Sequence, residues 1–294
     1  MSLQLFTDSS ANLSEETLTK RQIGVVSLTV SVGGEEMLCY EPGVAFDGEA
    51  FYARMREDKK LETKTSMINT AAFLAAFEPC LKAGGDVLYL AMSSGISGTC
   101  SAGQTAAGIL QSAYPERSVV VADTLSAVAG QGMQVLEAAD LRDSGRGAAE
   151  IASYIERRRA QIRQYFIVDD LIFLKRGGRI SGSAALAGTI MNLKPILKGN
   201  EKGCIVLDRK ALGRRKALAT LAELFGESDL DAPENRRAGI VHAGCEEDAR
   251  LLADRIAREH PNVRVTVDCF EPCTGSHVGP GAVGLFFWGG EKRK

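Results

Sequence analysis

Short apolar runs alternate with amphipathic stretches along most of this chain. The apolar runs are rich in Val, Ile, Leu and aromatic residues, and most lack strict polar alternation, which is typical of strands buried on both faces in parallel sheets. They occupy residues 3–7, 86–92, 118–123, 165–169, 238–244, 263–270 and 283–288. Stretches with helical periodicity lie between them at residues 126–143, 147–163 and 246–260. This order predicts an α/β architecture with right-handed crossovers.

The pattern changes near residue 163, where we predict a domain boundary. The predicted fold is α/β with two lobes: residues 1–163 form a mostly parallel first lobe, and residues 164–294 form a second α/β lobe. The second lobe opens with a strand and a basic Gly-Gly loop, and a helical pattern follows over residues 183–192. Turn residues at 199–200 and 202–203 then predict a hairpin.

Composition narrows the class of protein. The chain has 294 residues, 45% hydrophobic and 24% charged, as expected for a globular protein with about two domains. A formal net charge of -2 argues against a general binder of nucleic acid or membrane surfaces. Seven Cys without a C-x-x-C motif indicate reduced thiols, and we expect no metal and no cofactor. The N-terminus lacks the features of a signal peptide, so we expect a cytoplasmic protein.

A hydroxyl-rich loop follows the predicted strand at residues 86–91. The segment "MSSGISGTCSAGQTAA" carries Ser93, Ser94, Ser97 and Thr99 with two glycines, directly before an Ala-rich helix. In parallel sheets, ligands bind at the carboxyl ends of strands, and the N–H groups at a helix N-terminus favour an anion. A helix cap by Ser94 or Ser97 would explain one hydroxyl, but not four. The segment therefore predicts an anion site.

The surrounding charges indicate which anion this would be. The segment has neither G-x-x-x-x-G-K-[ST] nor G-x-G-x-x-G, and Asp86 is the one charged residue between Gly84 and Gln111. A phosphate with about two negative charges would require a cation nearby. Neutral hydroxyl donors suit a monoanion such as a carboxylate.

Two further segments carry candidate ligand-binding residues. Thr65 and Ser66 precede a predicted helix at residues 70–77, which Asn69 or Thr70 would cap, and Pro79 should end or kink that helix. His277 lies among glycines at 275, 279 and 281, before an apolar strand. His277 could donate to an anion, although a surface loop would explain it equally well. Of the other two histidines, His260 is interpreted as structural and His242 stays ambiguous.

Charged residues give weaker indications. Lys175, Arg176 and Arg179 surround the Gly pair, and a second basic cluster covers residues 209–216, including Arg214 and Arg215. Each cluster could be a solvated face, but together they predict a positive patch for an acidic partner or a phosphate. The three arginines at 157–159 are interpreted as solvated. Asp8 and Asp123 each close a strand, and we expect both carboxylates to accept backbone N–H bonds and organise loops.

These motifs, in this order, resemble the DegV family of fatty-acid-binding proteins, which includes the FakB subunits. The resemblance covers nearly the whole chain and includes "TDSSANLS", "EAFYARM", "KTS", "SSGISGT", "VADTLSAVAGQG", "VDDLIFLKRGGRIS", "NLKPIL" and "GSHVGPGAVGLFF". It implies a lipid between two lobes. The carboxylate would meet residues of "KTS", "SSGISGT" and "SHVGPG", which here are Thr65, Ser66, Ser93, Ser94 and His277. This chain differs from the common pattern at Met67, Ile68 and Asn69, at Glu41, at Thr124 and at Leu212.

The resemblance also implies partners. Proteins of this kind present the acid to a separate ATP-dependent kinase that makes an acyl phosphate, and a transient contact with a membrane is compatible with this role. Arg176, Arg179, Arg214 and Arg215 are predicted to lie in loops with their charged groups in water and to receive the kinase. An alternative hypothesis is a hydrolase or acyltransferase with Ser93 or Ser94 as nucleophile and His277 as base. No G-x-S-x-G elbow supports that hypothesis. A sensor for another small carboxylate is a third hypothesis.

Overall fold

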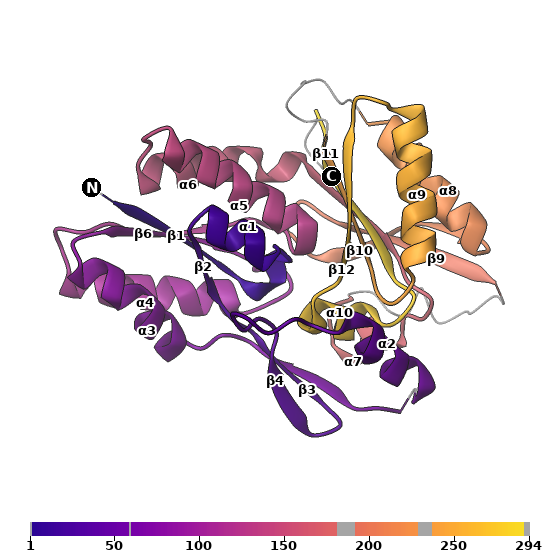
Figure 1. Cartoon of the computed structure of the whole chain (residues 1–294), viewed down its shortest axis with the longest axis horizontal. Helices are drawn as coiled ribbons and strands as arrows, with labels where there is room; N and C mark the ends of the chain where they lie inside the picture. Colours follow the sequence, from indigo (N-terminus) through magenta and orange to yellow (C-terminus); the bar gives the residue numbers. More distant parts are fainter. Residues whose placement is uncertain (1, 59, 181–191, 229–236, 291–294) are drawn as a thin grey trace. The chain divides into compact units, whose positions relative to one another are not determined.

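The computed structural model describes residues 2–58, 60–180, 192–228 and 237–290. The chain forms two compact units (Figure 1). The first contains Met1–Phe46 and Thr65–Arg159, and the second contains Asp47–Lys64 and Ala160–Lys294. The sequence pattern predicts one boundary near residue 163, whereas the chain enters the second unit twice. Within the described residues, no helix combines the length and apolar character needed to cross a bilayer.

Four parallel strands form the main sheet of the first unit, in the order β2-β1-β6-β7. Leu5 in the central strand β1 pairs with Ile23 on one side and Leu88 on the other. The apolar runs that predicted buried parallel strands are confirmed here. The strands are β1 (Leu3–Asp8), β2 (Ile23–Val26), β6 (Asp86–Ala91) and β7 (Val119–Asp123).

Helices cover both faces of this sheet, which explains why its strands lack polar alternation. Val135 and Ile151, from α5 and α6, pack with Leu5 and Leu88 on one face (Figure 1). On the other face Tyr89 packs against the α3 side chain Phe73, with 4.8 Å between ring centroids. The helices are α1 (Glu15–Lys20), α3 (Thr70–Lys82), α4 (Thr99–Ala113), α5 (Val128–Asp143) and α6 (Ala148–Arg158).

A smaller sheet has the order β4-β3-β5. Its strands are β3 (Thr29–Val32), β4 (Glu35–Leu38) and β5 (Thr63–Ser66). The hydrophobic pattern did not predict these short strands. After β5, Asn69 caps α3 by accepting the Ala72 N–H at 2.9 Å, as expected. The helix continues past Pro79 to Lys82, so of the two effects expected of Pro79, ending the helix does not occur.

The second unit has a six-stranded mixed sheet, in the order β10-β9-β8-β13-β11-β12. Among the described strands of this sheet, β11 and β12 pair in parallel and the other neighbours are antiparallel. The expectation of parallel strands therefore fails for most of this unit, although the predicted hairpin is present as β9 and β10. The strands are β8 (Ile162–Ile167), β9 (Leu193–Gly199), β10 (Ile205–Leu212), β11 (Arg237–His242), β12 (Arg264–Cys269) and β13 (Val283–Trp288).

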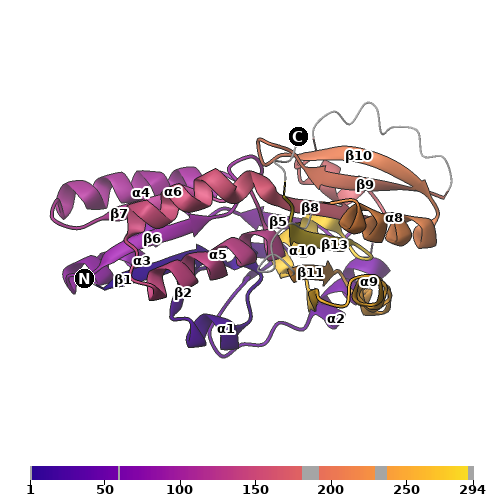
Figure 2. The same cartoon turned by 90° about the horizontal axis from the view of Figure 1, so that it is seen from above.

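Helices α8 and α9 pack side by side and form the core of the second unit with the sheet (Figure 2). Phe225 of α8 contacts Phe287 of β13, with 4.8 Å between ring centroids. The helices of this unit are α2 (Gly48–Glu57), α7 (Ile172–Arg176), α8 (Arg214–Gly226), α9 (Glu246–Glu259) and α10 (Pro272–Val278). The helix predicted over residues 183–192 falls almost wholly outside the described residues.

Candidate functional site

The hydroxyl-rich loop leaves the carboxyl end of β6 and enters α4, as its sequence predicts. Ser93 is buried, and its Oγ accepts the N–H of Gly95 at 3.1 Å. Its backbone N–H donates to the Ser126 carbonyl at 2.8 Å, which ties the loop to the segment after β7. Ser97 Oγ accepts the N–H of Thr99, the first residue of α4, at 3.2 Å. Part of the polar pattern therefore organises the turn that precedes α4, while Ser93 lies inside the unit.

Asp8 fixes the point at which this loop begins. It ends β1 and is fully buried. Its carboxylate accepts the Met92 N–H at 2.9 Å, the Tyr89 hydroxyl at 2.7 Å, the Ser10 N–H at 3.2 Å and the Gln131 amide at 3.2 Å. The expectation that Asp8 organises a loop is confirmed. These hydrogen bonds offset the free-energy cost of burying the charged carboxylate.

Asp123 organises the same loop from β7. It accepts the Leu125 N–H at 2.9 Å, the Ser94 N–H at 3.3 Å and the Ser94 hydroxyl at 2.6 Å. The Ser94 side chain is exposed, and its hydroxyl proton points to a carboxylate. As arranged here, Ser94 therefore holds the loop and does not offer its proton to a second anion.

Thr65 and Ser66 end β5. Successive side chains of a strand point to opposite faces, and Thr65 is half-buried while Ser66 is exposed. Directly after them, Met67 lies over the hydroxyl-rich loop, since a Cβ at Gly98 would be only 2.7 Å from the Met67 Sδ. The segment with Thr65 and the loop with Ser93 are therefore neighbours within the first unit.

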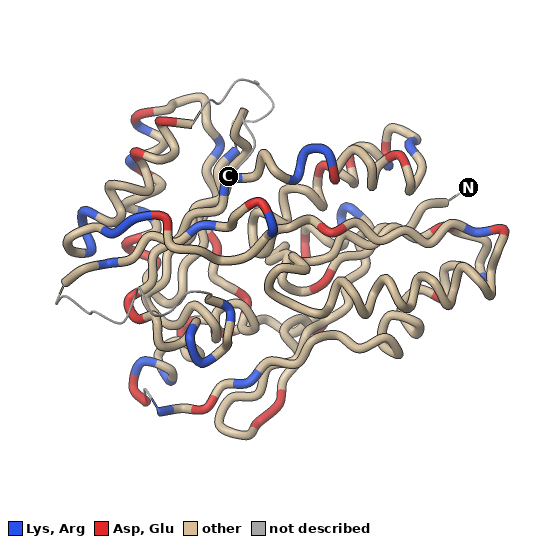
Figure 3. The backbone as a smooth tube through the Cα atoms, turned by 180° about the vertical axis from the view of Figure 1, so that it is seen from behind, with Lys and Arg blue, Asp and Glu red and all other residues tan. Residues whose placement is uncertain are grey.

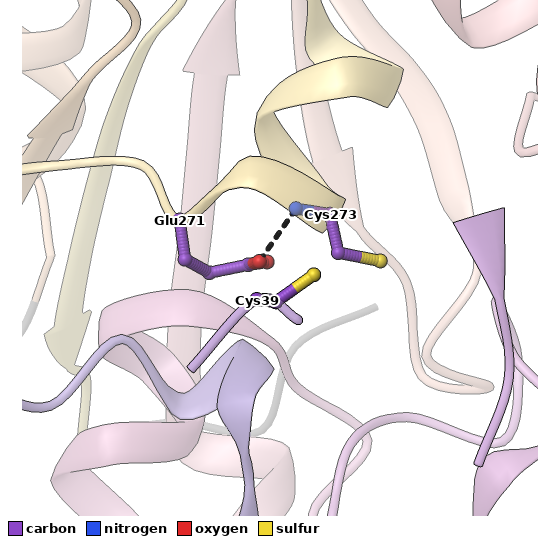
Figure 4. A group of neighbouring side chains, drawn as sticks. All are labelled: Cys39, Glu271 and Cys273. Atoms are coloured by element: carbon purple, nitrogen blue, oxygen red, sulfur yellow. Dashed lines mark hydrogen bonds between the residues drawn. The ribbon is translucent and has the colours of Figure 1, made fainter. Parts of the chain in front are cut away.

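His277 lies in the last turn of α10, in the second unit. Glu271 starts this helix by accepting the N–H of Cys273 at 2.6 Å (Figure 4). It also accepts the N–H of Thr274 at 2.6 Å. The imidazole lies against Gly177, where a Cβ would be 2.2 Å from the His277 Nδ1. This contact explains the first glycine of "RGGR". Burial, and then the positive charge of Arg179, lower the pKa of His277 to about 4, so the ring is neutral at pH 7.

A tyrosine from α2 supports the same helix. The Tyr52 side chain is fully buried, and its hydroxyl donates to the Phe270 carbonyl at 2.8 Å, just before α10. A Cβ at Gly275 would lie 1.8 Å from the Tyr52 Oη, so α10 can pack here only with glycine at this position. Arg56, one turn further along α2, donates to the Gly244 carbonyl at 2.9 Å. The segment with "EAFYARM" therefore belongs to the second unit and holds the helix that carries His277.

The four arginines that were expected in loops with solvated charges differ in their secondary structure and in their exposure. Arg176 ends α7, and Arg214 and Arg215 begin α8, so the loop assignment is wrong for these three. Arg176 and Arg215 are exposed. Arg179 is half-buried, and its Nη1 donates to the Gly177 carbonyl at 2.5 Å. Arg214 is part-buried and hydrogen-bonds to several segments, so the prediction that its charged group lies in water is also wrong.

Of the arginines at 157–159, Arg157 is exposed as expected, whereas Arg158 and Arg159 are less solvated than expected. Arg158 contacts the Glu137 carboxylate and the Tyr154 hydroxyl. Arg159 Nη1 donates to the Asp123 carbonyl at 2.6 Å, which brings a positive charge to the end of β7 beside the hydroxyl-rich loop. Successive helical residues point about 100° apart, so a run of three at a helix end cannot all face solvent in the same direction. The run of three consecutive arginines in the sequence therefore already indicated that the three side chains differ in exposure.

The other two histidines have distinct surroundings. His260 caps α9, and its ring contacts Phe225 edge to face, with 5.1 Å between centroids, which confirms a structural role. His242 ends β11 and is buried, and burial lowers its pKa. Its Nδ1 has no hydrogen-bond partner within the part of the chain that the structure describes. All three histidines belong to the second unit, so the first unit has no Ser–His pair of its own.

Comparison with known proteins decides the family. The profile of the DegV family, described as uncharacterised proteins, matches residues 2–289. The chain belongs to the DegV family. A DegV domain-containing protein of Clostridium perfringens is 35% identical over 288 residues, which cover 98% of each chain.

Solved DegV structures share the whole fold. A fatty-acid-binding DegV family protein from Thermus thermophilus has a TM-score of 0.85 at 28% identity, covering 98% of this chain and 100% of that one. DegV of Bacillus subtilis, a fatty acid binding protein, has a TM-score of 0.83 at 30% identity, covering 98% and 99%. The Streptococcus pneumoniae fatty acid kinase B3 protein, loaded with linoleic acid, has the same fold at 19% identity, with a TM-score of 0.82 and coverage of 98% and 99%.

Proposed function

We propose that this DegV family chain binds one long-chain fatty acid and has no catalytic activity of its own. The observation that carries the proposal is the match, over 98% of the chain, to the fatty acid binding DegV protein of Bacillus subtilis. The buried hydroxyl of Ser93 at the carboxyl end of a parallel strand supports it. This is the position at which open α/β sheets bind ligands.

The carboxylate would take its donors from Thr65, Ser93 and His277. Thr65 and Ser93 belong to neighbouring segments of the first unit, and His277 comes from the second unit. A neutral imidazole and neutral hydroxyls can satisfy one negative charge by hydrogen bonds. The family resemblance also implies Ser66 and Ser94 as residues that contact the carboxylate. We now assign these two residues lesser roles, because Ser66 is exposed and the Ser94 hydroxyl donates to Asp123.

The acyl chain would dominate the affinity. Burying about fifteen methylenes at ~0.8 kcal/mol each contributes roughly 12 kcal/mol, from which the cost of association is subtracted. The polar residues would then fix the orientation of the acid and the position of its head group.

We further propose that the bound acid is presented to an ATP-dependent fatty acid kinase. The resemblance to the FakB subunits supports this step, and the shared fold with the Streptococcus pneumoniae kinase B3 protein is consistent with it. The exposed Arg176 and Arg215, with the half-buried Arg179, are the proposed docking residues. Arg214 leaves this set because its guanidinium is hydrogen-bonded within the second unit.

Lipid mass spectrometry of the purified protein tests the proposal. Denaturing extraction should release a long-chain fatty acid, about one per chain, and protein stripped of lipid should take up oleate or palmitate. Recovery of polar metabolites alone, with no uptake of either acid, would refute it. A Ser93-dependent burst of ester hydrolysis would favour the hydrolase hypothesis instead.

A further inference from the structure

Arg214 joins four separate segments of the second unit. It is the first residue of α8, and its Nε and Nη2 both reach the Asp248 carboxylate, at 2.8 and 2.7 Å. Nη1 lies 3.3 Å from the Asp169 carboxylate and 2.5 Å from the Gly281 carbonyl, and Nη2 lies 3.4 Å from the Cys245 Sγ. Together these contacts involve Nε, Nη1 and Nη2 of the guanidinium.

One of these contacts fixes the turn that follows α10. Gly281 has a φ of +83°, and a Cβ there would lie 2.1 Å from the Asp169 Oδ2, so the turn is pressed against that carboxylate. Its N–H donates to the Ala243 carbonyl at 2.8 Å, while its carbonyl accepts from Arg214. Hydrogen bonds therefore hold the two peptide groups that flank the Gly281 Cα.

The same turn is continuous with His277. Gly279 closes α10 by donating to the Gly275 carbonyl at 2.8 Å, and a Cβ at Gly279 would lie 2.3 Å from the Phe173 ring. A shift of residues 279–281 would therefore also move the last turn of α10. In that turn the His277 ring packs directly against Gly177, where an added Cβ would not fit.

We propose that Arg214 is a positioning residue that holds the turn at residues 279–282 and thereby the placement of the His277 side chain. Its relevance to ligand binding rests on the proposed function, in which His277 meets the fatty-acid carboxylate. The charges around Arg214 support a structural use. Arg214 and Lys194, which is 2.7 Å from Asp169, together balance the carboxylates of Asp169 and Asp248.

The planar guanidinium is specific for this task. Arginine presents five donors in a fixed fork, whereas the Lys ammonium is a single point of charge. A lysine at position 214 could pair with one carboxylate but could not also reach the other and the Gly281 carbonyl. The contacts therefore require the shape of arginine as well as its charge.

The experiment compares Arg214→Gln and Arg214→Lys with Lys216→Gln. Lys216 is an exposed residue of the same helical turn whose side chain pairs with Glu223 at 3.0 Å. The imidazole signals of the lipid-free protein are followed by NMR as a function of pH, and His277→Gln identifies the His277 signal by its loss. Oleate affinity is measured on the same samples.

We expect the His277 signal of Arg214→Gln to move and its titration midpoint to rise from about 4 toward the ordinary value. Oleate affinity should fall about tenfold, Arg214→Lys should lie between, and Lys216→Gln should match the wild type. A folded Arg214→Gln with unchanged His277 signal and midpoint overturns the proposal. If Arg214→Gln does not fold, the His277 signal of Arg214→Lys decides in the same way. A wild type that binds no oleate refutes the proposed function, and the NMR result still tests the role of Arg214.

Discussion

Adjacent hydroxyls in the candidate site are not equivalent, and the difference follows from backbone geometry. In the extended strand β5, Thr65 and Ser66 point to opposite faces, and the Thr65 side chain is the more buried of the two. At the end of β6, Ser93 is buried while Ser94 donates to Asp123. The sequence showed which segments carry hydroxyls but not which member of each pair faces a ligand, because the choice depends on which face is covered.

The two pairs supply a matched test. We expect Ser93→Ala and Thr65→Ala each to lose ~1.5–3 kcal/mol of fatty-acid binding, about tenfold to over a hundredfold in Kd, because a buried anion loses a donor. Ser66→Ala and Ser94→Ala should change Kd by less than about threefold. Titration of each variant with oleate and with its methyl ester measures this. Equal losses within a pair would contradict the assignment.

The depressed pKa of His277 predicts how stability depends on pH. The unfolded chain takes up a proton on this residue near its ordinary pKa, whereas the folded protein takes it up only near 4. Between these values the unfolded state binds more protons, so the contribution of His277 to stability is lost as pH falls from about 6.5 to about 4. Above that window its contribution is constant.

Urea denaturation of lipid-free wild type and His277→Gln at several pH values tests this. The free energy of unfolding of the wild type should fall more steeply over the window than that of the variant, in which position 277 cannot titrate. His242, whose pKa is also lowered, is present in both proteins and cancels in the difference. Parallel curves for the two proteins would show that His277 is not held neutral by the fold.

At the scale of elements, α10 and α2 depend on each other through one contact. Glycine inside a helix is ordinarily less stable than alanine by ~0.5–1 kcal/mol. At Gly275 this order should reverse, because the new methyl group would meet the buried Tyr52 hydroxyl at 1.8 Å. Overpacking of this kind typically costs ~1–3 kcal/mol.

We therefore expect Gly275→Ala to lower the free energy of unfolding by ~1–3 kcal/mol. Gly108→Ala, in α4, where nothing lies near the added methyl group, should leave it unchanged or raise it by up to ~1 kcal/mol. Chemical denaturation of both variants measures the difference. In a Tyr52→Phe background the cost of Gly275→Ala should shrink, since the nearest atom is gone. A cost that does not depend on Tyr52 would place the strain elsewhere.

The hydrophobic pattern predicted every strand of the first unit's main sheet except β2, and it predicted helices α5, α6 and α9. It failed for the direction of pairing in the second unit. The run Val283–Trp288 is buried at all six positions, and an apolar run of this kind looks the same whether its neighbours are parallel or antiparallel. The sequence also did not show that residues 47–64 join the second unit. That placement depends on contacts far along the chain, such as Tyr52 with Phe270.

At the scale of the whole molecule, 35 Lys and Arg stand against 37 Asp and Glu, so neither sign of charge predominates. Lys and Arg are interspersed with Asp and Glu along the described backbone of each unit (Figure 3). Recognition of a kinase would therefore depend on a few local cations. Of the arginines first considered, Arg214 is bound to Asp169 and Asp248, whereas Arg176 and Arg215 are exposed. Reversing Arg214 would place a third carboxylate beside two others, so that variant cannot separate docking from folding.

The cleaner test reverses Arg176 and Arg215 together. We expect Arg176→Glu with Arg215→Glu to keep the oleate affinity of the wild type but to lose most acyl-phosphate formation with a cognate fatty acid kinase and ATP. Surface charges steer an encounter and act mainly on the association rate, so raising the salt concentration should weaken the wild type toward the variant. A control that reverses Arg250 and Arg258, two exposed residues of α9, carries the same change in net charge. It should keep both activities. Turnover at the wild-type rate by the Arg176–Arg215 variant, at low and high salt, would show that the kinase docks elsewhere.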